Sequence, residues 1–144
     1  MRQHPQTYAI TAVTYNRRRL FQRTEMADRF ISTLFRYREG NKFKLHAFVV
    51  MPDHIHAILT PAPDHTIERC AQLIKGGFSF AIRQDAAGEI WQDGYYAHRV
   101  IDEDDLNNQL QYILSNPIRK HYADYPHIYT TEAYATRLDA SPTI

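Results

Sequence analysis

Two apolar runs separated by only two residues constrain the fold of this chain more than any other feature. The first run is KFKLHAFVVM (42–51) and the second is HIHAILT (54–60). Both combine β-branched and apolar residues in the manner of strands. The intervening Pro52 and Asp53 are typical turn residues. The stretch therefore predicts a tight β-hairpin.

The segment before the hairpin predicts one strand and one helix. Residues 8–15, YAITAVTY, alternate and are rich in β-branched residues, which indicates a strand. In residues 24–39, Met26, Phe30 and Leu34 recur every four positions, which is the spacing of one helix face.

After the hairpin, the pattern predicts a helix, a strand and a third helix. The second helix begins near Thr66, with Thr66 or Asp64 as its cap, and Gly76-Gly77 is expected to interrupt it because each glycine costs about 1 kcal/mol relative to alanine. Residues 95–101 predict a strand. Asp102 then caps a third helix that should end near Asn116, because Pro117 follows.

The resulting order is strand, helix, strand, strand, helix, strand, helix. This predicts an α+β fold, a ferredoxin-like antiparallel sheet with a β-α-β-β-α-β core and an added C-terminal helix that bears Tyr112. No repeat or flexible linker divides the 144 residues, so we expect a single domain over residues 1–144.

Composition excludes several classes of protein. The single cysteine, Cys70, excludes an internal disulfide and a multi-cysteine zinc site. No apolar run approaches the roughly 18 residues that a membrane helix needs. The opening residues, MRQHPQTY, lack the apolar stretch of a signal peptide, so we expect a cytoplasmic protein without membrane contact.

Charge is unevenly distributed along the chain. Residues 1–44 hold ten Lys or Arg and three Asp or Glu, whereas residues 45–116 hold four and ten. A basic surface from the first third would suit a polyanion such as nucleic acid. A solvated basic helix paired with acidic neighbours would give the same count, and charge alone does not separate the two.

His54 and His56 form a candidate metal site in the second strand of the hairpin. Residues two apart on a strand share a face, with Cβ atoms roughly 7 Å apart, so two imidazoles can converge on one ion. The alternative is that both face water or hydrogen-bond elsewhere. Ile58 shares their face, which indicates that this part of the sheet is partly covered.

Tyr112 and Asn116 form a second candidate pair, on the third helix. They are four residues apart and therefore neighbours on one face. Tyr112 projects roughly 135° away from the apolar stripe of that helix, so it does not fill the core beneath it. A tyrosine near a metal could act as a nucleophile, and Asn116 could add a carbonyl oxygen. The alternative is a tyrosine packed on the C-terminal tail.

Together, VVMPDHIHAIL and YILSNPIRK resemble the single-tyrosine HUH transposases, and the Tyr-x-x-x-Asn-Pro run is closest to their REP-associated branch. The likeness covers a core of about residues 7–120 and leaves a tail, 118–144, that is only loosely similar. It implies that His54 and His56 bind the metal, Mg²⁺ or Mn²⁺, that Asn116 is the additional ligand, and that Tyr112 is the nucleophile.

The resemblance also implies a reaction and a substrate. The family acts on single-stranded DNA, and its REP-associated branch recognises hairpins with a short 5′ guide tetranucleotide. We therefore expect cleavage and strand transfer through a covalent 5′-phosphotyrosine, in transposition or in a domesticated derivative. A homodimer and a monomer are both compatible with the sequence.

The expected DNA contacts are basic and aromatic side chains. The phosphate-binding candidates are Arg17, Arg18, Arg19, Arg29, Arg36 and Lys75. The stacking candidates are Tyr96, with Tyr15, Tyr95 and Phe78, of which at least half are expected in the core. The Lys75-Gly76-Gly77 stretch could admit DNA to the backbone, and we expect His98 to be structural or solvent-facing.

Two other functions fit the same residues. A ferredoxin-like sheet can be a non-catalytic platform for single-stranded nucleic acid, although this chain lacks the aromatic-rich run of common RNA-binding domains. A small metal-dependent hydrolase would use water as nucleophile and leave Tyr112 incidental.

Overall fold

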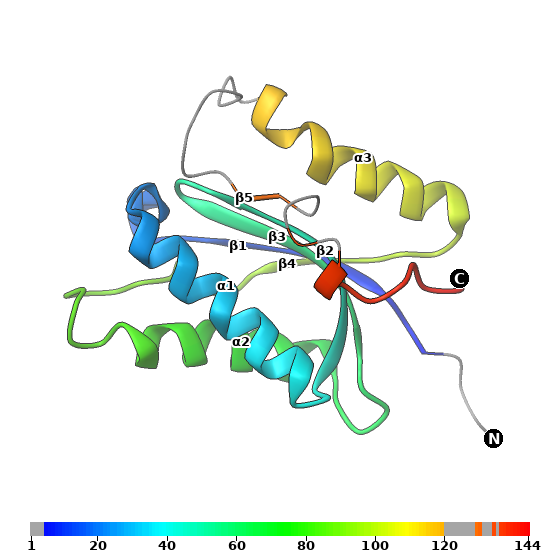
Figure 1. Cartoon of the computed structure of the whole chain (residues 1–144), viewed down its shortest axis with the longest axis horizontal. Coiled ribbons are helices and arrows are strands. Elements are labelled where there is room, and N and C mark those ends of the chain that lie inside the picture. Colours follow the sequence, from blue (N-terminus) through cyan, green and yellow to red (C-terminus); the bar gives the residue numbers. More distant parts are fainter. Residues whose placement is uncertain (1–4, 120–128, 131–133, 135) are drawn as a thin grey trace.

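The computed structural model describes residues 5–119, 129–130, 134 and 136–144 of the chain (Figure 1). Its elements, in order, are β1 (Tyr8–Val13), the 3-10 helices η1 (Tyr15–Arg17) and η2 (Leu20–Gln22), α1 (Thr24–Glu39), β2 (Phe43–Met51), β3 (His54–Pro61), α2 (Ile67–Ala81), β4 (Tyr96–Arg99), α3 (Glu103–Arg119) and β5 (Tyr129–Thr130). None of the described helices is both long and apolar enough to cross a membrane.

The strands form one antiparallel sheet in the order β4-β1-β3-β2-β5. The predicted hairpin is present, with Met51 opposite His54 on either side of Pro52-Asp53. The predicted α+β, ferredoxin-like class is confirmed, since β1 to β4 with α1 and α2 form the β-α-β-β-α-β core. The strand expected over residues 95–101 is shorter, and β5 adds a two-residue strand beside β2.

Each face of the sheet has its own helical layer. In Figure 1, α1 and α2 lie together on one face and α3 lies alone on the other. Side chains of β3 alternate accordingly: Ile55, Ala57 and Leu59 join the core cluster of α1 and α2. Ile58 belongs instead to a smaller cluster with Leu106 and Ile113 of α3, and on a strand His54 and His56 point to that same face.

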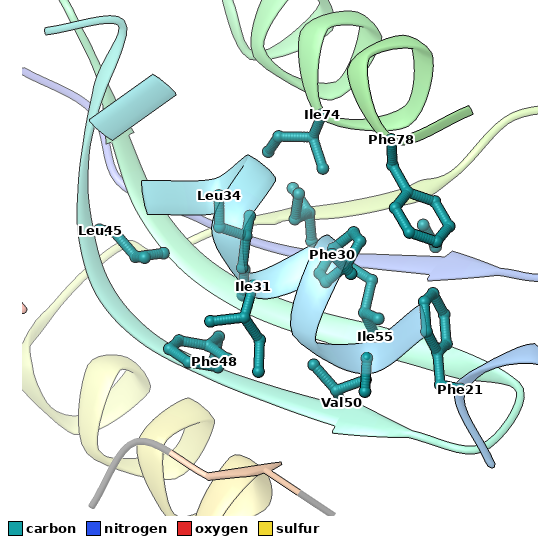
Figure 2. Packing of buried hydrophobic residues seen from close by; sticks show 14 of the residues in the cluster. Phe21, Phe30, Ile31, Leu34, Leu45, Phe48, Val50, Ile55, Ile74 and Phe78 are labelled. Carbon is teal, nitrogen blue, oxygen red and sulfur yellow. The ribbon is translucent and has the colours of Figure 1, made fainter. Parts of the chain in front are cut away.

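The layer of α1 and α2 holds the main core. Phe21, Phe30, Phe78 and Trp91 pack there with ring centroids 5.4–6.0 Å apart. Figure 2 shows Phe21, Phe30 and Phe78 beside the aliphatic side chains of the sheet. Phe78 is fully buried, so its assignment as a DNA-stacking side chain is wrong: it faces the main core.

Two predictions about helix ends are wrong. The helix α2 continues through Gly76-Gly77 to Ala81 instead of breaking there. A Cβ atom on Gly77 would lie 2.5 Å from the Tyr37 hydroxyl oxygen, so the glycine admits a ring from α1, not DNA. The helix α3 likewise continues past Pro117 to Arg119, two residues beyond the proline expected to end it.

Side-chain caps fix where α2 and α3 begin. The Thr66 hydroxyl accepts from the Arg69 N–H, which identifies Thr66, and not Asp64, as the cap of α2. At α3, the Asp105 N–H donates to the Asp102 carboxylate at 2.8 Å. The caps predicted at Thr66 and Asp102 are therefore present.

The C-terminal segment that the structure describes is hydrogen-bonded to β2 through Asp139. Asp139 donates its backbone N–H to the Leu45 carbonyl and accepts the Leu45 N–H through its carboxylate, at 2.9 and 2.8 Å. Arg38 of α1 donates two further bonds to the same carboxylate. Burial favours protonation of Asp139, but the bonds from Arg38 and Leu45 outweigh it and hold its pKa below the usual value.

Candidate active site between β3 and α3

His54 and His56 lie side by side beneath α3. Their ring centroids are 4.9 Å apart and their planes are inclined by 79°. Each residue is 7% exposed, which excludes the alternative that both face water. Strand periodicity brings the rings together, and the α3 layer covers them.

One nitrogen of each ring is oriented by a neighbouring side chain. His56 Nδ1 lies 2.7 Å from the Thr11 hydroxyl oxygen, and His54 Nδ1 lies 2.7 Å from a carboxylate oxygen of Asp53. Such contacts fix the ring orientation of metal-binding histidines and make Nε2 the atom through which a metal would be bound.

Asp53 also connects the histidine pair to a basic side chain. Its other carboxylate oxygen lies 3.4 Å from the Arg17 guanidinium. Burial would raise the pKa of Asp53, but the hydrogen bond and charge of His54, with those of Arg17, hold that pKa below its usual value. Asp53 therefore remains a carboxylate that can orient His54 near neutral pH.

Tyr112 of α3 contacts the histidine pair from the helix that covers this face of the sheet. Its ring meets His56 edge-on, with centroids 5.1 Å apart and planes at 85°. The residue is 38% exposed, so it is open to solvent on one side and in contact with His56 on the other. The structure thus brings together the two motifs that the sequence analysis selected separately.

Asn116 lies one turn after Tyr112 and is 1% exposed. Neither its amide oxygen nor its amide nitrogen has a hydrogen-bond partner among the described residues. Burying a polar group in this way costs free energy, so such a group in a native structure needs an explanation. A ligand that binds the amide oxygen would supply one.

The donor set fits a divalent cation with open coordination positions. The described residues contain no group of three or more His, Cys, Asp or Glu that could hold a metal. The protein ligands would therefore be two imidazole nitrogens and the amide oxygen of Asn116, a set that leaves coordination positions open, unlike a closed structural zinc site.

A cleft of about 590 Å³ extends from His56 and Tyr112 toward β4. Its lining also includes Ala9, Thr11, Tyr96, Asn108, Gln109 and Gln111. Asn108, Gln109 and Gln111 of this lining were not among the residues predicted from the sequence. The polar run NNQLQ (107–111) in the middle of α3 indicates polar side chains, but it does not reveal that this surface faces β4.

The predicted DNA-binding residues divide between the two faces of the sheet. Arg17, whose side chain is 64% exposed, lies beside Asp53 and thus near the histidine pair. Arg19 is exposed, whereas Arg18 donates to the backbone carbonyls of Ala87 and Glu89. Tyr96 is 65% exposed and lines the cleft.

The other basic candidates lie in the layer of α1 and α2, away from His54 and His56. Arg29 binds Asp85 and the Ala81 carbonyl. The Lys75 ammonium donates to the carbonyls of Gln92 and Gly94, and Arg36 lies over the Tyr37 ring.

Two aromatic candidates and His98 also have defined places. Tyr95 is half-buried against the main core, whereas Tyr15 is 45% exposed. His98 Nε2 lies 2.8 and 2.9 Å from the Asp105 carboxylate oxygens and ties β4 to α3, the structural role expected of it.

A family model described as "Transposase IS200 like" matches residues 3–116. The REP-associated tyrosine transposase of Escherichia coli K12 is 28% identical over 98 residues, which are 65% of this chain and 58% of that protein. The chain therefore spans less than two thirds of that relative. A Haemophilus influenzae relative is 26% identical over 129 residues, 81% of this chain and 73% of its own length.

The fold has also been observed in solved structures. A REP-associated tyrosine transposase bound to a REP hairpin superposes with a TM-score of 0.76 at 22% identity, over all of this chain and 92% of that one. A Deinococcus radiodurans protein gives a TM-score of 0.59 at 24% identity over 79% of this chain. At these identities the likeness establishes the fold.

Proposed function

Since this chain belongs to the IS200-like transposase family, we propose that it cleaves and rejoins single-stranded DNA through a covalent bond to Tyr112. The contact between Tyr112 and His56, one turn from the buried amide of Asn116, carries this proposal. Its relatives include proteins named as REP-associated tyrosine transposases, and one similar fold was solved with a REP hairpin. These relatives support hairpin DNA as the substrate, and the solved structure, which superposes over all of this chain, supports a single domain.

His54, His56 and Asn116 would hold Mg²⁺ or Mn²⁺. When bound, the ion would supply positive charge that stabilises the transition state at the phosphate. Thr11 and Asp53 orient the two rings before any ligand arrives, so binding costs little reorganisation. The Asn116 amide would at the same time gain the partner that it lacks among the described residues.

The reaction is a transesterification. The Tyr112 oxygen attacks phosphorus, a new oxygen–phosphorus bond forms, and the bond to the 3′ oxygen of the cleaved strand breaks. The phenolic proton is released and the departing oxygen gains one, so a 5′-phosphotyrosine and a 3′-hydroxyl result. Because one phosphoester replaces another, a second 3′-hydroxyl can reverse the step and join strands without ATP.

The surroundings of the site suit a nucleic-acid strand. Arg17 is exposed near the histidine pair and would bind a phosphate, and Arg19, two residues further along and also exposed, could bind another. Tyr96, at the far side of the cleft, would stack on an unpaired base. Arg29, Arg36 and Lys75 lie in the other layer and are left out of this proposed interface.

A covalent-adduct assay tests the proposal. Labelled hairpin DNA with a single-stranded flank is incubated with Mn²⁺ and resolved on a denaturing gel. Wild type should form a protein–DNA adduct, Tyr112→Phe and a chelator should abolish it, and Tyr15→Phe, a comparably exposed tyrosine, should retain it. Cleavage by Tyr112→Phe would identify a hydrolase instead, and tight binding without cleavage would identify a binding module.

A further inference from the structure

We propose that the cleft between α3 and β4 binds one unpaired nucleobase beside the scissile phosphate, stacked on Tyr96 and read by amide side chains of α3. This inference rests on the proposed DNA substrate. Through this cleft the protein would contact a base directly and would help to select the position at which the strand is cut. The amide side chains are Asn108, Gln109 and Gln111.

The register of the sheet sets the distance between Tyr96, where the base would stack, and His56, where the scissile phosphate would lie. Tyr96 lies opposite Thr11, and Thr11 lies opposite His56, so the three residues form one row across β4, β1 and β3. Neighbouring strands are about 4.8 Å apart, which separates the backbones of Tyr96 and His56 by about 10 Å. A phosphate at His56 and Tyr112 therefore leaves the adjacent base within reach of Tyr96.

The lining of the cleft favours a base over a phosphate. Among its described lining residues there is no Lys or Arg, and the first turn of α3 carries Glu103, Asp104 and Asp105. Phosphate groups would be repelled from the end of the cleft that lies by the start of α3, away from His56 and Tyr112. Amide side chains both donate and accept hydrogen bonds, which matches the mixed pattern on the edge of a base.

The walls of the cleft are fixed before a ligand arrives. The Asp105 carboxylate bonds to His98 of β4, accepts the Ile101 N–H and bonds to Gln109. This network holds the start of α3 against β4. A volume of about 590 Å³ lies within the roughly 300–1,000 Å³ typical of small-ligand sites and is enough for one base.

Tyr96 is the proposed stacking surface because the described residues do not pack its ring into a core. It is 65% exposed on an edge strand and belongs to neither hydrophobic cluster. Stacking of a base on an aromatic side chain typically changes affinity by about 5- to 150-fold.

The first test measures binding of hairpin DNA to wild type in a chelator, with single abasic sites placed through the unpaired flank. We expect one position at which loss of the base weakens binding by about 5- to 150-fold. In Tyr96→Ala the same abasic site should change affinity less than about twofold, whereas Tyr96→Phe should keep the full effect. Phe80→Ala, which removes an equally exposed ring from α2, is the matched control and should also keep it.

The second test varies the base at that position. Asn108→Ala and Gln111→Ala should reduce discrimination among the four bases, and Asn107→Ala, a neighbour on α3 that does not line the cleft, should not. Equal weakening of intact and abasic strands by Tyr96→Ala would overturn the proposal. So would the absence of any abasic-sensitive position.

The adduct assay, run beside these measurements, separates the two proposals. An adduct on Tyr112 without abasic sensitivity would overturn the base-binding cleft and leave the transesterification standing. Abasic sensitivity that depends on Tyr96, without an adduct, would support the cleft and overturn the covalent mechanism.

Discussion

Thr11 and His56 are register partners on β1 and β3, and the Thr11 hydroxyl oxygen lies 2.7 Å from His56 Nδ1. A hydrogen bond from a neighbouring side chain to a metal-binding histidine typically contributes about 10- to 100-fold to metal affinity. Thr11→Val should therefore weaken Mn²⁺ binding by about 10- to 100-fold, as measured by calorimetric titration. Thr33→Val, a buried threonine of α1, is the control, and equal affinities for the two variants would contradict the assignment.

Asn116→Leu should stabilise the metal-free protein and abolish its response to metal. The variant replaces buried amide atoms that lack described partners with apolar ones, a gain of about 1–3 kcal/mol in the free energy of unfolding. Mn²⁺ should raise the melting temperature of wild type but not of the variant. Asn107→Leu, an exposed change on the same helix, should retain the metal response. A destabilised Asn116→Leu would mean that the amide is already well paired.

Arg17 and Arg36 should differ in their effect on DNA binding. Each phosphate contact on a single strand contributes about 0.7 to the slope of log affinity against log salt concentration. Arg17→Gln should reduce this slope by about that amount, because Arg17 lies near the histidine pair. Arg36→Gln should leave it unchanged, since Arg36 lies over Tyr37 in the other layer. A smaller slope for Arg36→Gln and an unchanged slope for Arg17→Gln would indicate that DNA binds to the surface of α1.

Alanine substitutions at the adjacent glycines Gly76 and Gly77 of α2 should change the stability of the protein in opposite directions. A Cβ atom on Gly76 meets nothing within 4 Å, so Gly76→Ala should stabilise the helix by up to about 1 kcal/mol. Gly77→Ala should destabilise, because its Cβ would collide with the Tyr37 ring. Denaturant unfolding measures both, and the cost of Gly77→Ala should fall when Tyr37 is already alanine. Independent effects of the two changes would refute this contact.

The Arg38–Asp139 pair should weaken in acid. The pKa of Asp139 is lower in the folded protein than in the unfolded chain, so its contribution is complete above about pH 4 and is lost as the pH falls through the folded value. At pH 7, Asp139→Asn should cost about 1–3 kcal/mol. The difference from wild type in urea unfolding should shrink below pH 4. A difference that stays constant down to pH 3 would argue against the charged pair.

Local patterns predicted the parts of this protein that depend on local geometry. Strand periodicity placed His54 and His56 on one face, and helical periodicity placed Tyr112 and Asn116 together and away from the apolar stripe. The family prediction is confirmed as well, because the family model matches residues 3–116, which include both residue pairs. The catalytic and metal-binding roles of these residues remain predictions.

Long-range packing accounts for what the patterns did not predict. Charge counts do not reveal the layer in which a basic side chain lies, and so Arg29 and Lys75 were grouped with Arg17. The role of Gly77 depends on Tyr37, forty residues earlier in the chain. The amide-lined cleft exists only because α3 crosses the sheet beside β4.

The unequal size of the two cores has a consequence for motion. Among the described residues, the helix that bears Tyr112 packs on a small hydrophobic cluster, whereas α1 and α2 share a much larger aromatic one. Elements with few buried contacts open at lower free energy than the whole domain. Backbone amides of α3 should thus exchange with deuterium well before those of α1 and β3, so that Tyr112 can move away from His56 while the strands that hold His54 and His56 stay folded.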